Sequence, residues 1–267
     1  MSDELKAKVQ AQFGAASGAY VTSEIHAKGE SLALLVELTR PQPDWQVLDV
    51  ATGAGHTALT MAPYVARVVA TDLTAAMLAQ TAELAAARGL TNVETRPADA
   101  EALPFDDASF DLVTCRLAFH HFPNPRQAIA EFARVLKPAG LLGFTDNIVV
   151  PDKQAAGYYN AYEKLRDPSH NWVYPLVRLQ AMFEAAGLQV EAIRELSKEF
   201  EFHEWADRQH VSAADKEKLL QMMRNIPEAL QPLFVPRWTD ETMYFSLWEV
   251  VMVARLPSRD SQGQVTT

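Results

Sequence analysis

Cysteine is almost absent from this chain, which has one, Cys115, among 267 residues. A single cysteine excludes an internal disulfide and a metal cluster held by cysteine ligands. Cys115 ends an apolar segment that is typical of a core strand. We therefore expect it to pack inertly and not to act as a nucleophile.

Long apolar runs are absent as well. None approaches the roughly 20 residues that a membrane-spanning helix needs. The chain starts with Met-Ser-Asp-Glu-Leu-Lys, which is too charged for a secretory signal. We therefore expect a cytoplasmic protein with no membrane span.

Clusters of basic residues are the third absence. The chain has 24 Lys and Arg against 34 Asp and Glu, a net charge of -10, and the basic residues are not grouped. A protein that binds nucleic acid needs a cationic face to neutralise phosphates. We therefore expect no nucleic-acid partner and no large anionic membrane-bound substrate. The sequence still allows a small anion to bind in a compact basic pocket.

What the chain has is a regular alternation of strand-like and helix-like segments over residues 45–150, which predicts a parallel sheet wound with helices. Its most informative segment is Val47-Leu-Asp-Val-Ala-Thr-Gly-Ala-Gly-His-Thr-Ala58, an apolar strand followed by a turn of small residues and a helix start. Taken alone, Gly53-x-Gly55-x-x-Ala58 fits the dinucleotide fingerprint, so an NAD(P)-dependent oxidoreductase is one alternative. Asp49 argues against it, because a carboxylate at the strand end would repel a pyrophosphate.

Acidic residues follow the next strands. Asp72 ends the strand 67–72, 17 residues after Gly55, where it can accept hydrogen bonds from both hydroxyls of a ribose. The motif Asp99-Ala-Glu-Ala-Leu-Pro-Phe105 comes next. The strands 110–115 and 141–145, with the segment Glu131–Gly140 between them, complete the series.

As a set, these motifs resemble the class I S-adenosylmethionine (SAM)-dependent methyltransferases, in the group of the ubiquinone and menaquinone C-methyltransferases (the type 11 methyltransferase domain). The match covers residues 45–147, and His120–Pro125 and Glu163–His170 extend the similarity to bacterial methyltransferases of that group. The resemblance implies an α/β fold, a Rossmann-like three-layer α/β/α sandwich whose mostly parallel sheet has an antiparallel last strand over 244–254. It also implies helical lid segments, the cofactor SAM, the product S-adenosylhomocysteine (SAH) and no metal.

The chain divides accordingly into four parts. We expect an N-terminal helical lid (1–40), a SAM-binding core (41–150), the second half of the core with a helical cap insertion (151–257), and a polar, disordered tail (258–267). The cap is expected from 153–172 and 203–240, with polar helical sequence over 204–224.

The resemblance assigns a part of SAM to each acid. Asp49 lies near the methionine ammonium and sulfonium, Asp72 at the ribose, and Asp99 at the adenine amino group. Arg116 either covers the methionine moiety or holds an anion of the acceptor. With Ala100 and Leu73 at the adenine ring, the expected cofactor-binding residues are Asp49, Ala51, Gly53, Gly55, Asp72, Leu73, Asp99, Ala100 and Arg116.

Two alanines depart from the family pattern. Ala51 and Ala139 stand where glycine is usual. A methyl group at Ala51 is tolerable if its φ is negative.

Catalysis and acceptor binding are assigned to other residues. His120 is the candidate general base, because a pKa near ~6.5 suits proton removal at neutral pH. In the family, a histidine at the position of His121 bonds a backbone carbonyl, and the pair alone does not make a metal site. The candidate acceptor-binding residues are Tyr20, His26, Tyr158, Tyr159, Arg166 and His170, with Trp205, Arg208, Arg237 and Trp238 as further candidates in the cap.

The expected reaction moves a methyl group from SAM to an oxygen or carbon atom, less readily a nitrogen atom, of a small organic acceptor by in-line displacement. Two alternatives stay open at this point. One is the oxidoreductase, and the other is a SAM-binding regulatory protein that has lost catalysis. The sequence leaves the acceptor, the need for a base and the oligomeric state undecided.

Overall fold

The computed structural model describes residues 2–21, 29–259 and 265–266. In this part of the chain one sheet has the strand order β3-β2-β1-β4-β5-β8-β6, and the short strand β7 pairs with β8. The bounds are β1 Gln46–Val50, β2 Arg67–Asp72, β3 Val93–Pro97, β4 Phe110–Arg116, β5 Leu136–Asn147, β6 Gln189–Glu201, β7 Arg237–Trp238 and β8 Met243–Arg255.

Strands β1 to β5 run parallel to one another, whereas β8 lies between β5 and β6 and is antiparallel to both. The prediction of a mostly parallel sheet with an antiparallel last core strand is confirmed. The register places Val47 of β1 opposite Val68 of β2 and Leu112 of β4. Apolar side chains of the central strands therefore lie level with one another and meet helices on both faces.

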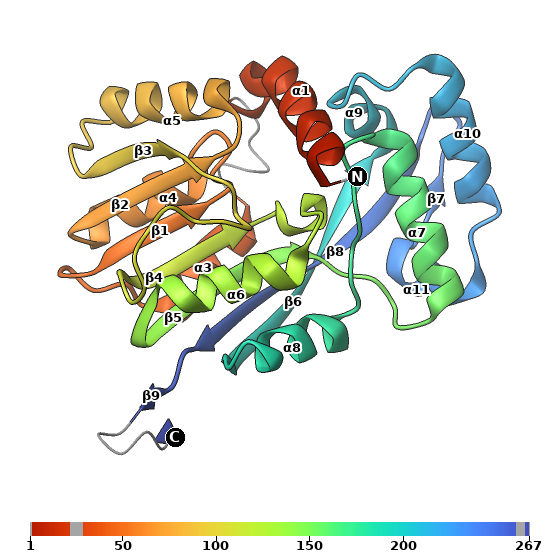
Figure 1. The fold of residues 1–267 in the computed structure, drawn as a ribbon. Coiled ribbons are helices and arrows are strands. Elements are labelled where there is room, and N and C mark those ends of the chain that lie inside the picture. Colours follow the sequence, from red (N-terminus) through yellow and green to blue (C-terminus); the bar gives the residue numbers. More distant parts are fainter. Residues whose placement is uncertain (1, 22–28, 260–264, 267) are drawn as a thin grey trace.

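Helices cover both faces of the sheet and make the expected three layers (Figure 1). On one face lie α3 (Glu30–Thr39), α4 (His56–Met61) with η1 (Ala62–Tyr64), and α5 (Ala75–Ala87); on the other lie α6 (Pro125–Val135) and α8 (Leu176–Ala185). A Cβ on Gly143 of β5 would lie 3.0 Å from the Leu35 side chain of α3. A glycine at this position is what lets α3 pack closely on the sheet.

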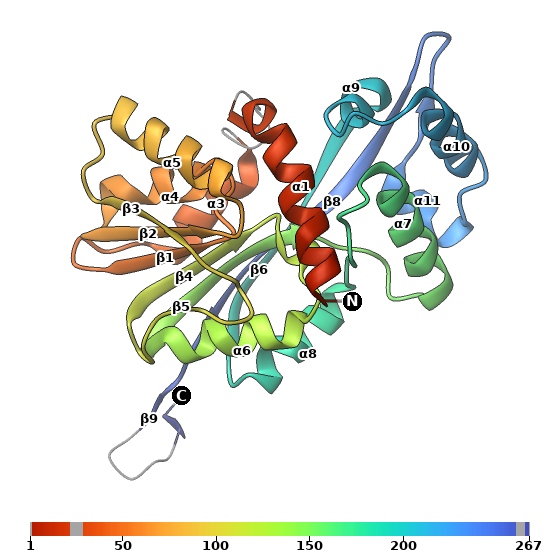
Figure 2. The ribbon, with the colours of Figure 1, turned by 45° about the horizontal axis from the view of Figure 1, so that its top comes forward.

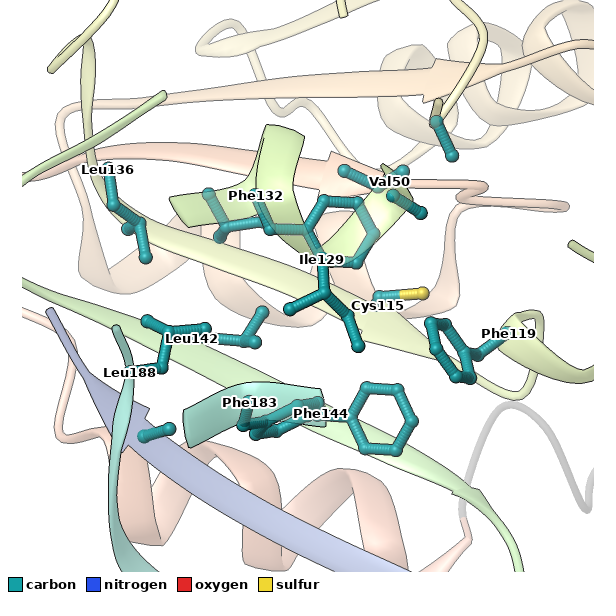
Figure 3. Close-up of a cluster of buried hydrophobic side chains, with 14 of the residues drawn as sticks. Val50, Cys115, Phe119, Ile129, Phe132, Leu136, Leu142, Phe144, Phe183 and Leu188 are labelled. Carbon is teal, nitrogen blue, oxygen red and sulfur yellow. The ribbon is translucent and has the colours of Figure 1, made fainter. Parts of the chain in front are cut away.

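The apolar cluster between the sheet, α6 and α8 is drawn in Figure 3. Phe144 of β5 packs edge to face against Phe119 and Phe183, with ring centroids 5.2 Å apart in each pair. Cys115 is buried in this cluster, and burial raises the pKa of its thiol well above the usual value. A buried, protonated thiol is unreactive, as expected for Cys115.

A cap with its own apolar cluster packs on the parts of β6 and β8 that extend past the other strands (Figure 1). Tyr162 and Trp205 stack in it, with centroids 5.3 Å apart and 13° between the ring planes. The helices of the cap are α7 (Lys153–Arg166), α9 (Phe202–Asp207), α10 (Ala213–Arg224), η3 (Glu228–Leu230) and α11 (Gln231–Phe234).

The helical stretch expected over 204–224 is two helices. His210 has a left-handed φ of 55°, a conformation that ends a helix. Ser212 then caps α10 by accepting a hydrogen bond from the Asp215 N–H at 3.1 Å. The expectation of continuous helix is therefore wrong between α9 and α10.

The two ends of the chain also differ from expectation. Within 1–40, α1 (Ser2–Val21) lies beside α5 and crosses toward the cap (Figure 2), whereas α3 packs on the sheet. In the tail, β9 (Ser258–Arg259) and β10 (Val265–Thr266) pair, although we expect no regular structure there. Among the described helices, none combines the length and the apolar character that crossing a bilayer requires.

The two alanines that replace glycine both have a left-handed backbone, with φ of 52° at Ala51 and 64° at Ala139. The condition set for Ala51, a negative φ, is therefore not met. A residue with a Cβ costs about 1–2 kcal/mol in this conformation. The chain tolerates this strain at a loop that lines the cavity described below and at an exposed position near the start of β5.

Replacing Ala139 by glycine should raise the free energy of unfolding. Relief of the left-handed strain gains about 1–2 kcal/mol, and the greater freedom of glycine in the unfolded chain loses about 0.4–1 kcal/mol, so the net gain is about 0.5–1 kcal/mol. Denaturant unfolding of Ala139→Gly measures it. The control is Ala79→Gly on exposed α5 surface, where the same substitution should destabilise by about 1 kcal/mol. A loss of stability in both variants would contradict the strain assigned to Ala139.

Candidate functional site

The expected site residues meet at a cavity along the carboxyl edge of the sheet. The cavity has a volume of about 210 Å³ and is bounded by α1, the ends of β1, β2, β4 and β5, the middle of β8, and the cap. Ligands of open α/β sheets bind at this edge. The expected cofactor residues that line it are Asp49, Ala51, Gly53, Asp72, Leu73, Asp99, Ala100 and Arg116.

Gly55 is the expected cofactor residue that lies outside this lining. Its φ is 84°, and an added Cβ would come within 2.6 Å of the Thr81 side chain on α5. Thr81 also donates a hydrogen bond to the carbonyl oxygen of Gly53 at 2.9 Å. Gly55 therefore lets the loop and α5 approach each other, which holds Gly53 against the cavity.

Asp49 is buried under the cavity floor, and protein groups occupy both of its oxygens. Oδ1 accepts a hydrogen bond from Thr114 Oγ1 at 2.6 Å, and Oδ2 accepts from Thr52 Oγ1 at 2.5 Å and from the Ala58 N–H at 3.2 Å. Burial raises the pKa of Asp49, and these bonds together with the charge of Arg116 oppose the rise. Asp49 thus ties β1 to β4, to the glycine loop and to α4.

Asp72 ends β2 at the cavity and holds the glycine loop from the other side. Its Oδ2 accepts a hydrogen bond from the Gly53 N–H at 3.0 Å, and its Oδ1 accepts from the Thr74 N–H at 2.8 Å. Burial raises the pKa of Asp72, and both of these hydrogen bonds oppose the rise. A carboxylate fixed this way has remaining lone pairs for the hydroxyl groups of a ligand.

Helix α1 closes the cavity over Asp99. Lys6 forms ion pairs with Asp99 at 2.6 Å and with Glu101 at 2.7 Å. Burial lowers the pKa of Lys6, but the two carboxylates outweigh it and the pKa is raised. Gln12 bonds Gln209 of the cap at 2.6 Å. Helix α1 is therefore joined both to the β3 side of the cavity and to the cap.

The strand order divides the cavity into two halves. Neighbouring strands lie about 4.8 Å apart, so Asp72 on β2 and the β8 end of the cavity, four strands away, are separated by roughly 19 Å. The acids Asp49, Asp72 and Asp99 lie over β1, β2 and the loop after β3. Arg116 ends β4 in the middle, and the far half is lined by Asn147 of β5, by Leu247 and Glu249 of β8 and by side chains of the cap.

Arg116 is buried at this midpoint. Its Nε donates a hydrogen bond to Thr57 Oγ1 at 3.1 Å. Burial lowers the pKa of Arg116, while the carboxylates of Glu249 and Asp49 favour its charged form. The guanidinium thus places a positive charge between the two halves, between a carboxylate on each side.

His120 lines the far half and is paired with a carboxylate. Its Nδ1 lies 2.6 Å from Asp146 Oδ1, and its backbone N–H donates to Asp146 Oδ2 at 3.0 Å. Burial disfavours the imidazolium, but the charge and hydrogen bond of Asp146, together with the charges of Glu163 and Asp167, outweigh burial, and the pKa of His120 is raised. The carboxylate holds a proton on Nδ1, so the neutral ring has its lone pair on Nε2.

Two more histidines surround His120. His121 Nδ1 lies 3.0 Å from the Ser169 carbonyl oxygen, and His170 Nε2 lies 2.8 Å from Asn160 Oδ1. Burial and the neighbouring His120 lower the pKa of His121 to about 4. Burial and the neighbouring His120 and His121 lower the pKa of His170 to about 2. Both rings are therefore neutral at neutral pH and act in packing.

The structure brings few of the expected acceptor-binding residues to the cavity. Arg166 lines it, with its guanidinium 4.3 Å from the Trp205 ring centroid. His170 is buried behind His120, Tyr159 is buried in the cap cluster, and the Tyr158 hydroxyl donates to the Met222 carbonyl oxygen at 2.6 Å. These three expectations do not hold for this cavity, because Tyr158 and Tyr159 of α7 pack within the cap and His170, in the loop after α7, is bonded to Asn160.

The remaining acceptor-binding candidates differ in where the structure places them. The backbone of Tyr20 belongs to α1, and His26 lies outside the described residues. Trp205 and Arg208 line the cavity, whereas Arg237 pairs with Glu199 and Trp238 is exposed.

Sequence reasoning missed Asp146, Lys6 and Glu249. Asp146 and Glu249 lie at the edge where strands end, a position that marks site residues, but each is inside an apolar strand pattern. The sequence around Lys6 does not indicate a site residue, since Lys6 reaches the site only through the placement of α1. Within the described ranges, no group of His, Cys, Asp and Glu has the arrangement of a metal site.

The sheet order, the glycine loop and the acids after β1, β2 and β3 define the class of protein as a SAM-dependent methyltransferase. Residues 48–144 match the family model described as a methyltransferase domain. The chain is 37% identical over 199 residues to the uncharacterized methyltransferase YcgJ of Bacillus subtilis (strain 168), covering 74% of this chain and 78% of that protein. The chain therefore belongs to the SAM-dependent methyltransferases, and the oxidoreductase alternative is wrong.

Two further proteins extend the likeness. The demethylmenaquinone methyltransferase of Clavibacter sepedonicus is 34% identical over 168 residues, which is 61% of this chain and 67% of that protein. A crystal structure of a provisionally named methyltransferase from Bacillus halodurans C-125 has a TM-score of 0.82 and 36% identity, and the match covers 85% of this chain and 99% of that one.

Acid should destabilise the fold through His121 and His170. Their folded pKa values lie below the unfolded value near ~6.5, so the unfolded chain binds more protons and stability falls as the pH drops below about 6.5. The loss is on the order of 2 kcal/mol per histidine at pH 5. Urea unfolding of His170→Gln between pH 7 and 5 should show a shallower loss, whereas exposed His203→Gln should follow the wild type. Equal slopes in all three proteins would contradict this assignment.

Proposed function

We propose that the protein transfers the methyl group of SAM to an oxygen or carbon atom, less readily a nitrogen atom, of a small organic acceptor, and needs no metal. The observation that carries the proposal is one cavity that joins the acids of the SAM motifs to a His–Asp pair about three strands away. The paired histidine at that end favours catalysis over SAM binding alone.

The near half of the cavity fits SAM. Asp72 would accept hydrogen bonds from the ribose hydroxyls, and Asp99 would accept one from the adenine amino group. Leu73, Met77 and Ala98 supply apolar surface for the adenine ring. Asp49 would act on the methionine end by its charge, because its oxygens are already bonded within the protein.

SAM supplies an activated methyl group: a bond forms to the acceptor atom while the carbon–sulfur bond breaks and the sulfonium becomes the neutral thioether of SAH. The chain itself aligns the two reactants and excludes water, and alignment alone can supply roughly 7–11 kcal/mol of the barrier reduction in favourable cases. Helix α1 and the cap provide the exclusion.

His120 would take the acceptor proton on Nε2. Asp146 keeps Nδ1 protonated and stabilises the imidazolium that forms, because it lies 2.6 Å away on a buried strand end. Arg116 would stabilise negative charge that develops on the acceptor as it loses the proton. A base and a nearby guanidinium suit a hydroxyl or an acidic C–H group, whereas an uncharged amine needs neither before it reacts.

Asp72→Asn should weaken SAM binding by about 1.5–3 kcal/mol, because a charged acceptor for the ribose hydroxyls is lost. The amide keeps one oxygen for the loop, so the fold should persist. Titration calorimetry in the presence of a chelator measures the affinity, with Asp44→Asn at the opposite edge of the sheet as the control. An unchanged dissociation constant, or binding of NADH in place of SAM, would count against the proposed cofactor site.

His120→Gln should lower turnover by roughly 10²- to 10⁴-fold with little change in SAM affinity. Formation of SAH from SAM with a metabolite extract as the source of acceptor measures it. Because Asp146 raises the pKa of His120, the wild-type rate should climb with pH through a value above ~6.5, and Asp146→Asn should move this limb to lower pH. Full turnover of His120→Gln at every pH would show that His120 is not the general base. SAM binding with no SAH formed would instead favour a regulatory protein.

A further inference from the structure

Glu249 is a buried carboxylate with one oxygen left over. It lies on β8, and its side chain is 5% exposed. Oε1 accepts a hydrogen bond from Lys198 Nζ at 2.5 Å. Oε2 is buried and has no hydrogen-bond partner among the described residues, although Glu249 lines the cavity. A buried carboxylate oxygen without a donor is costly, so its presence at a cavity indicates a donor that comes with a ligand.

The sheet register places Glu249 in the far half of the cavity. Glu249 is paired with Asn147 of β5, the residue after Asp146, which holds His120. From Asp72 the distance across four strands is roughly 19 Å, so Glu249 lies beyond the part of the cavity assigned to the adenine and ribose of SAM. Its side chain lies on the α3 side of the sheet, where Lys198 donates both to Glu249 and to Ser31, and it lines the same cavity as His120.

Two cations near Glu249 determine which kind of hydrogen-bond donor its free oxygen can accept from. Lys198 is bonded to it directly, and Arg116 is near enough that Glu249 favours the charged form of the guanidinium. Lys198 alone balances the charge of Glu249, and Arg116 is shared between Glu249 and Asp49. A cationic ammonium would therefore gain little from Glu249, whereas a neutral O–H or N–H group finds an acceptor that is already held in place.

On the basis of the proposed function, we propose that Glu249 is an acceptor-binding residue, and that the acceptor carries a second, neutral O–H or N–H donor besides the group that loses its proton to His120. Glu249 accepts from that second group and His120 from the first. The acceptor is therefore held at two points, which fixes the reacting atom against the methyl donor. Phe200, Trp205 and Leu247 on the same cavity wall suit an apolar or aromatic frame between the two donors.

The experiment measures binding of acceptor probes to the SAH complex by calorimetry. The probes are dihydroxyarenes, each compared with its mono-methyl ether, which keeps one O–H and loses the other. The wild type should bind each diol about 10- to 100-fold more tightly than its ether, because the second hydrogen bond is to a charged group. Glu249→Gln should lose this preference, since its amide presents N–H in place of an oxygen. Glu195→Gln, exposed on β6, is the matched control and should keep the preference.

The outcomes separate this inference from the proposed function. A wild type that does not bind SAH overturns the proposed function itself. A wild type that binds SAH but binds no diol, or binds each diol and its ether alike, overturns the role of Glu249. The role is also overturned if Glu249→Gln keeps the preference, or if it weakens SAH binding as much as diol binding. Unchanged SAH affinity with loss of the diol preference supports it.

Discussion

The buried carboxylate of Asp49 is the interaction on which the site depends. A negative charge inside a protein is stable only when hydrogen bonds replace the water it has lost. Asp49 obtains them from Thr114 on β4, from Thr52 in the glycine loop and from the first turn of α4. Satisfying one charge therefore fixes the spacing of β1 and β4, the path of the loop and the start of the helix. Asp72 grips the same loop through the Gly53 N–H, so two acids set the floor on which SAM would lie.

The cavity is assembled from segments that are far apart in the chain. Lys6 comes from α1, His120 from the turn after β4, Asp146 from β5, Arg166 from the cap and Glu249 from β8. Helix α1 joins these parts, since it bonds Asp99 at one end and Gln209 of the cap along its length. Its side chains line the cavity, whose volume of about 210 Å³ is below the roughly 300–1,000 Å³ of common ligand sites.

The two halves of the cavity hold different charged groups. Asp49 and Asp72 lie over β1 and β2, where a sulfonium and an ammonium would lie. Over β4, β5 and β8 each cation lies beside a carboxylate: Arg116 near Glu249 and Asp49, Lys198 at Glu249, and His120 at Asp146. A base held in this way suits an acceptor that loses a proton as it takes the methyl group. Strain in the loop, with Ala51 at φ 52°, is tolerated where the backbone must stay close to the ligand.

The sequence by itself determined the sheet, because alternating apolar strands and helices have few ways to bury their apolar faces. It also determined the cofactor half of the site, because Asp49, Asp72 and Asp99 follow consecutive strands and the ends of parallel strands share one edge. It could not determine the acceptor half. Tyr159 and His170 have residue types typical of a site but face the cap interior, while Asp146 and Glu249 lie within apolar strand patterns, yet the first holds His120 and the second lines the cavity. Which face of the cap helices points inward, and which strand lies beside β5, depend on packing between distant segments. Only the tertiary structure therefore decided that His120 has a carboxylate partner and that one carboxylate oxygen of Glu249 has no hydrogen-bond partner among the described residues.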